Sequence, residues 1–204
     1  MQQLKCRKTN NSCNDKSTPR EASEPKISNY KISFHTGKPL QSAISKLVAG
    51  TNGVLSVKEL HNFAVVRTQC FVYTLNFSGF VNITKLRSSS QIHQAIAKLH
   101  KLIHLPARCY DYAIDNITAS GAFGHYIPLH KLIQVITQPF PARLTYRPNY
   151  FSGASLKYDG GGTIILFTTY IIVGARCRAQ IQHIYKETLK ILMSMLQERT
   201  SYIT

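Results

Sequence analysis

Few carboxylates in this sequence could do acid–base chemistry. Residues 27–204 contain six carboxylates, at positions 59, 111, 115, 159, 187 and 198, and Asp111 and Asp115 form their one close pair. Acid–base catalysis needs groups that converge in one cleft, whereas this pair is expected near a strand start. Asp159 is followed by three glycines but not by the Gly-Lys-Ser/Thr of a phosphate-binding loop. We therefore expect no enzymatic activity.

The cysteines give no sign of a metal site. They occur at positions 6, 13, 70, 109 and 177, an odd number without a Cys-x-x-Cys pair. Zinc sites and disulfide frameworks have paired spacings, so we expect no metal and no cofactor. The first residues, MQQLKCRKTNN, lack an apolar signal segment, and no apolar run is long enough for a membrane span. These features favour reduced thiols inside the cell.

The charge of the chain indicates a polyanionic partner. There are 25 Lys and Arg against 9 Asp and Glu, a net charge of +16, and most of the excess lies in residues 27–204. So basic a body favours nucleic acid first and an anionic membrane second, with a merely basic surface as the alternative. Cations that bind phosphate displace condensed counterions, so binding would weaken steeply with salt.

Two similar series of elements follow a polar tail. Residues 1–25 are rich in Asn, Ser, Lys and Pro, which predicts disorder. The pattern then predicts a strand over 26–34, a helix over 40–48 opened by Pro39, four strands within 54–84 and an amphipathic helix over 91–103. The second series is a strand over 109–119, a helix opened by Pro128, four strands within 144–174 and a long closing helix, with Asp159-Gly160 as a hairpin turn.

The two series are copies of one unit. Five landmarks recur 87 to 90 positions apart: Asn29 and Asn116, Phe63 and Phe151, Phe77 and Phe167, Arg87 and Arg176, and Gln91 and Gln180. A duplicated unit of about 85–90 residues explains this spacing. We predict an α+β fold in which two pseudo-twofold repeats, 26–105 and 106–204, join into one antiparallel sheet with the closing helices on one face.

The repeated asparagines are candidates for base recognition. Asn is depleted in strands because its amide competes with the backbone, so Asn29 and Asn116 at matching strand positions need a reason. A carboxamide in the minor groove of DNA can donate to adenine N3 or thymine O2. The alternative is a strand-end cap or a solvent-facing Asn. The strands also carry more apolar residues than one covered face needs, so the second face is expected to be a binding surface or to be buried by a partner.

Several of these segments resemble the core domain of the TATA-box-binding protein family. They are LPARCYDYAIDNITASG, the Tyr-x-Pro-x-x-Phe-x-Gly pattern that starts at Tyr146, and TIILF followed by IIVGARCRAQI. NFAVVR, LNFSG and the segment Thr84–Arg87 resemble the first half of the family more weakly. The resemblance covers about residues 26–197 and implies a saddle whose curved antiparallel sheet faces a widened minor groove, with helices on the convex face.

The resemblance also implies the function and its residues. It implies a nuclear, non-enzymatic initiation factor that bends A·T-rich promoter DNA and assembles with transcription factor IIB-like and IIA-like proteins and the RNA polymerase machinery. The rings that wedge between base steps would be Phe63, Phe77, Phe151 and Phe167. The groove floor would be lined by Asn29, Asn116, Leu75, Ile165, Thr84, Val173 and Thr118. Phosphates would be held by Arg67, Arg87, Lys157, Arg176 and Arg178.

The sequence departs from the family at three places. The hairpins FSGFVN and FTTYII lack the family's lysine, and Lys31 and Thr118 replace the valines that usually flank the asparagines. A·T-rich or deformable DNA is therefore expected, not a strict TATA element. The loop called the second stirrup carries Arg147, Asn149 and Tyr150 where the family presents acidic residues to transcription factor IIB, a charge reversal that predicts a changed partner. The alternative function is a saddle-shaped interaction scaffold, or a regulatory paralogue with weak or non-TATA DNA binding.

Overall fold

The computed structural model of this 204-residue chain describes residues 22–105, 110–135 and 142–200. The elements in chain order are β1 (Lys26–His35), α1 (Gln41–Ile44), β2 (Val54–Glu59), β3 (Phe63–Thr68), β4 (Val72–Asn76), β5 (Phe80–Leu86), α2 (Gln91–Ile103), β6 (Ala113–Ala122), α3 (Leu129–Val135), β7 (Ala142–Thr145), β8 (Ala154–Tyr158), β9 (Thr163–Leu166), β10 (Tyr170–Ala175) and α4 (Arg178–Thr200).

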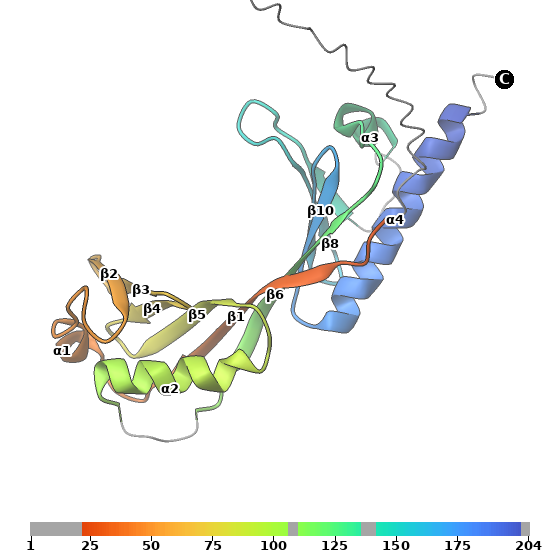
Figure 1. Cartoon of the computed structure of the whole chain (residues 1–204). Helices are drawn as coiled ribbons and strands as arrows, with labels where there is room; N and C mark the ends of the chain where they lie inside the picture. The colour runs from red at the N-terminus through yellow and green to blue at the C-terminus, as the bar shows by residue number, and fades with distance from the viewer. Residues whose placement is uncertain (1–21, 106–109, 136–141, 201–204) are drawn as a thin grey trace, which may run out of the picture.

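These strands form one antiparallel sheet. Within the described residues it has ten strands in the order β2-β3-β4-β5-β1-β6-β10-β9-β8-β7. The element order strand–helix–four strands–helix occurs twice, and the opening strands β1 and β6 pair with each other at the centre. Figure 1 shows the sheet bent into a saddle, with α2 beneath one half and α4 along the other. The predicted α+β saddle is confirmed.

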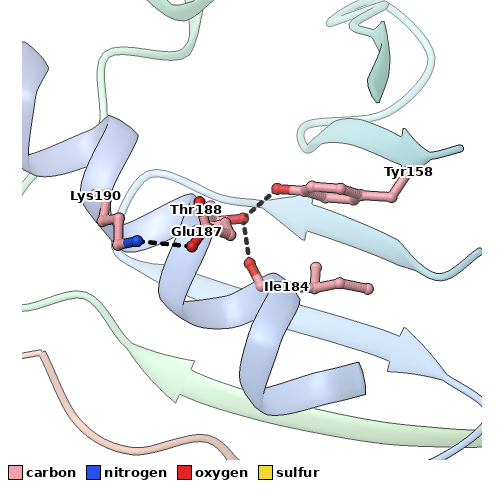
Figure 2. Close-up of polar contacts among 5 residues, drawn as sticks. All are labelled: Tyr158, Ile184, Glu187, Thr188 and Lys190. Atoms are coloured by element: carbon pink, nitrogen blue, oxygen red, sulfur yellow. Dashed lines mark hydrogen bonds and ion pairs between the residues drawn. The ribbon is translucent and has the colours of Figure 1, made fainter. Parts of the chain in front are cut away.

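The helices pack on the convex face of the sheet. Helix α2 buries the apolar stripe predicted from its sequence, which includes Ile92, Ile96 and Leu99. Helix α4 is tied to the second half through Tyr158, whose hydroxyl lies 2.8 Å from Thr188 Oγ1, as Figure 2 shows. Burial of the Tyr158 ring is the main cause that raises its pKa above the usual value of 10.0.

Strand side chains alternate between the two faces, as the period of two requires. On β3, Ala64, Val66 and Thr68 are buried beneath the sheet, whereas Phe63 and Arg67 lie on the opposite side. The other strands show the same alternation, except at bulges. The concave face therefore carries half-buried and exposed side chains, and no element of the described ranges covers it.

The same hydrogen bond opens the two long helices. The backbone N–H of Arg87 donates to Gln91 Oε1 (2.7 Å), and that of Arg176 donates to Gln180 Oε1 (3.3 Å). A glutamine that reaches back to a free N–H at a helix start satisfies a donor that the helix itself cannot. The two pairs are sequence landmarks of the repeat, so the structure places them at equivalent junctions.

Two predicted boundaries are wrong. Residues 22–25 were expected in the disordered tail, but the N–H of Ser23 donates to the carbonyl of Ala122 (3.0 Å), and Tyr185 Oη donates to the carbonyl of Ser23 (2.7 Å). Helix α1 ends at Ile44 and not near residue 48, because the N–H of Leu47 donates to the carbonyl of Ile44, three positions back, and so leaves the α-helical pattern. Residues 1–21 and 106–109 lie outside the described ranges, so the tail before residue 22 and the repeat boundary stay predictions.

Candidate nucleic-acid interface

Two β-bulges shape the centre of the concave face. On β6 the register shifts between the pairs Lys31–Asn116 and Ile32–Ile114, which leaves Asp115 as the extra residue. On β1 the register shifts between Ile27–Ala119 and Asn29–Thr118, which leaves Ser28 as the extra residue. A bulge places two neighbouring side chains opposite one partner. The result is two pseudo-equivalent groups, which together we name the central floor: Ser28, Asn29 and Thr118 in one, and Asp115, Asn116 and Lys31 in the other.

The asparagines of the central floor are held by hydrogen bonds. Asn29 Oδ1 accepts from the backbone N–H of Lys85 (2.7 Å), a residue in the left-handed conformation. Its Nδ2 is therefore the part that remains to donate. Asn116 Nδ2 donates to Thr118 Oγ1 (3.2 Å), and its side chain packs over Gly174, where a Cβ would come within 3.3 Å of Asn116 Oδ1. The fold thus brings Asn29, Asn116 and Thr118 together at the centre, and their role in base contact stays a prediction.

The residues of the predicted apolar lining lie on different faces of the sheet. Ile165 and Thr84 lie on the concave face, in alternation with buried neighbours. Leu75 and Val173 are fully buried under the helices, so the prediction that they line the groove is wrong. For both residues the predicted strand phase was wrong by one position, and a shift of one position moves a strand side chain to the other face of the sheet. Thr74 and Ile172 occupy the concave positions beside them.

In the second half, three rings form a cluster at one end of the concave face. Phe151 and Phe167 meet edge to face with centroids 5.6 Å apart, and Tyr170 stacks on Phe167 at 4.4 Å. Phe151 and Tyr170 are 46% and 42% exposed. Gly153 makes room for the cluster, because a Cβ there would lie 2.8 Å from Phe151 Cε1. Tyr170 was missed from the sequence, although an aromatic residue stands 90 positions earlier, at Phe80.

The rings of the first half are arranged differently. Phe77 is partly buried and packs against the core, whereas Phe80 in the same hairpin is 41% exposed and lies on the concave side. The structure therefore favours Phe80 over the predicted Phe77 as the exposed ring. Phe63 lies on the concave face, but not at the position equivalent to Phe151, because the β2–β3 connection (60–62) is shorter than the β7–β8 connection (146–153).

Exposed cations lie on the same face of the sheet as the rings. Arg67 and Lys157 lie on the concave face of β3 and β8, each in alternation with buried residues. Arg143 lies directly opposite Lys157 on β7 and was missed from the sequence. Like charges directly opposite each other destabilise a sheet, so an anion bound between them would be favourable.

The remaining cations predicted to bind phosphate differ in whether they are free to do so. Arg87 and Arg176 are exposed at the two strand–helix junctions. The guanidinium of Arg178 instead donates to Tyr30 Oη from Nη2 (2.9 Å) and Nε (3.1 Å). Because Tyr30 is buried on the helix-covered face, Arg178 is directed away from the concave face, and its assignment to phosphate does not fit this geometry.

The second stirrup projects from the same end as the ring cluster. Arg147, Asn149 and Tyr150 are exposed, Tyr150 to 89%. The N–H groups of Tyr150 and Phe151 both donate to the carbonyl of Arg147 at 2.9 Å, which holds the loop in a tight turn. A surface that contacts another protein there would present a cation and an aromatic ring, not carboxylates.

Two other kinds of site were searched for in the described part of the chain. It contains no group of three or more His, Cys, Asp or Glu side chains that could hold a metal ion. None of the helices described is long and apolar enough to cross a membrane.

Comparison with known proteins identifies the fold. No family model matches the chain, and no curated protein matches it. Among solved structures, the TBP of Methanococcus jannaschii is similar, with a TM-score of 0.64 and 17% sequence identity over 84% of this chain and 99% of that chain. At this identity the likeness concerns the fold, which the two chains share over nearly the whole of the Methanococcus jannaschii protein.

Proposed function

We propose that this chain binds double-stranded DNA in the minor groove with its concave face, bends it, and acts in the nucleus as a transcription initiation factor. The observation that carries the proposal is the uncovered concave sheet, with carboxamides at its centre and exposed rings near both ends. Minor-groove proteins use such amides to read base edges and apolar wedges to kink the duplex. The fold is shared with the TBP of Methanococcus jannaschii, which supports the use of the sheet that the family resemblance implies.

The proposed contacts fall into three sets. The wedges are Phe63, Phe80, Phe151 and Phe167, with Tyr170 stacked behind Phe167. The base-edge contacts are Asn29, Asn116, Thr118, Thr84, Ile165, Thr74 and Ile172. The phosphate contacts are Arg67, Lys157, Arg143, Arg87 and Arg176. We further propose that two saddle repeats, 26–105 and 106–204, each supply one half of these contacts.

Assembly partners are proposed from the same fold. A DNA-bound saddle leaves α2, α4 and the second stirrup free for IIB-like and IIA-like factors and the polymerase machinery. The exposed stirrup residues Arg147 and Tyr150 favour a partner that presents carboxylates there, since complementary charge sets partner choice.

One observation favours a second function, an interaction scaffold that does not bend DNA. Phe77 is partly buried against the core, which weakens the first half as a wedge. Asp115 brings a carboxylate onto the centre of the concave face, which disfavours A·T-rich DNA there. A scaffold of this kind would bind a protein in the saddle and have weak affinity for DNA.

A bending assay separates the two functions. A·T-rich duplexes labelled at both ends are titrated with the protein, and their end-to-end distance and affinity are measured at several salt concentrations. The proposed function predicts a shortened distance and an affinity that falls steeply with salt. An unbent duplex, or binding that is independent of salt, would refute the proposal and favour the scaffold.

A further inference from the structure

The two halves of the central floor differ in charge, although the fold makes them equivalent. In one half, Ser28 Oγ donates to the carbonyl of Thr118 (3.3 Å), and every side chain is neutral. In the other half, Asp115 replaces Ser28 and Lys31 replaces Thr118, each pair 87 positions apart. The pseudo-twofold axis therefore relates a neutral group to an ion pair.

The geometry of the ion pair leaves groups for a ligand. Asp115 Oδ1 accepts from Ser33 Oγ at 2.8 Å, whereas Asp115 Oδ2 and Lys31 Nζ are 3.6 Å apart, which is longer than a hydrogen bond. The side chains of Lys31 and Asp115 are 44% and 30% exposed. Ser33 fixes the carboxylate, so an acceptor and a donor lie side by side on the concave face.

This arrangement complements one base pair better than the others. In the minor groove an A·T pair presents only acceptors, whereas a G·C pair adds the guanine N2 amino donor between acceptors. A carboxylate against an A·T pair would lose its water and gain no partner, which is unfavourable. Against a G·C pair, Asp115 Oδ2 can accept from the amino group while Lys31 Nζ donates to cytosine O2 or guanine N3.

Resting on the proposed minor-groove function, we propose that Lys31 and Asp115 read the guanine amino group of a G·C pair on one side of the site's centre. The neutral half, with Asn29 and Thr118, favours A·T on the other side. Because the two halves differ, the pair also sets the orientation in which the saddle lies on an asymmetric site. A duplex with one central amino group can be bound in the orientation that places this group against Lys31 and Asp115. A second, twofold-related amino group would then lie against the neutral half, which offers it no carboxylate.

The test isolates the amino group. Four duplexes differ only at the two central, twofold-related positions. The first has A·T pairs at both positions and no minor-groove amino group, the second has one guanine, and the third has two guanines. The fourth has one inosine, a base that pairs with cytosine but lacks the amino group. We expect the first guanine to tighten binding about tenfold relative to inosine, as for a specific polar base contact, and the second guanine to weaken it. The same order is expected when 2-aminoadenine replaces guanine.

The matched variant is Lys31→Thr with Asp115→Ser. It gives the charged half the residues of the neutral half, keeps the net charge, and uses side chains that the same bulge already accommodates at Ser28 and Thr118. We expect the variant to bind and bend A·T duplexes at least as well as the natural chain, and to be weakened by even one amino group. Circular dichroism and thermal melting establish that it is folded.

The outcomes separate the two proposals. If one guanine weakens the natural chain as much as it weakens the variant, the reading by Lys31 and Asp115 is wrong while the minor-groove function stands. If neither protein binds any of the duplexes, the proposed function fails and this inference fails with it.

Discussion

Removal of the Phe151 ring tests the proposed wedge most directly. Phe151 is 46% exposed, so insertion between base pairs would bury about 90 Å² of a ring surface of about 200 Å². At about 25 cal/mol per Å² this burial contributes about 2 kcal/mol, or about thirtyfold in affinity. We expect Phe151→Ala to lose this affinity for A·T-rich DNA and much of the bend, and Phe151→Ala with Phe167→Ala to abolish bending.

The assay is the same end-to-end distance measurement, with affinity determined in parallel. Tyr126→Ala is the control, because Tyr126 is 60% exposed but lines a cavity against α4 on the helix-covered side. It should leave affinity and bend unchanged. Thermal melting is measured for each variant, because Phe151 also packs on Phe167. A folded Phe151→Ala, Phe167→Ala protein that still bends DNA would show that these rings are not the wedge.

Three further changes test other parts of the structure. Lys157→Gln should reduce the slope of log affinity against log salt by about 0.9, whereas Lys186→Gln on α4 should leave it unchanged; equal slopes for both variants would remove Lys157 from the phosphate contacts. Gly153→Ala places a Cβ 2.8 Å from Phe151 Cε1, so we expect a loss of about 1–3 kcal/mol of stability by overpacking, seen in thermal melting together with a weaker bend; unchanged values of both would contradict the packing described. Burial raises the pKa of Tyr158 above 10.0, so this side chain ionises at lower pH in the unfolded chain than in the folded one. The contribution of Tyr158 to the pH dependence of stability should therefore be absent below about pH 10 and destabilising above it; in Tyr158→Phe the alkaline loss of stability should be smaller, and an identical alkaline pH profile would contradict the assignment.

Much of the fold could be predicted because the sequence repeats its local signals. The landmark Gln91 recurs as Gln180, and each closes the same hydrogen bond at a helix start. Asp159-Gly160 lies in the turn between β8 and β9, where the hairpin was expected. The apolar stripe of α2 is buried as its spacing predicts. These features depend on neighbours within a few positions along the chain, so local sequence patterns determine them.

The face on which each side chain lies was decided only by the tertiary structure. Leu75 and Val173 were assigned to the groove and are buried beneath it, because the phase of a strand depends on bulges and turns that the pattern does not locate. Phe77 is partly buried against the core, whereas Phe80 in the same hairpin is exposed.

By itself, the sequence determined the order of elements, the basic charge and the asparagines at matching strand positions. It did not determine that Asp115 lies beside Lys31. These residues are 84 positions apart, on the paired strands β6 and β1, and the β-bulge on β6 brings their side chains together. Which residues share the concave face, and which charges meet there, depends on the pairing register between distant strands. That register is settled only when the whole sheet packs on its helices.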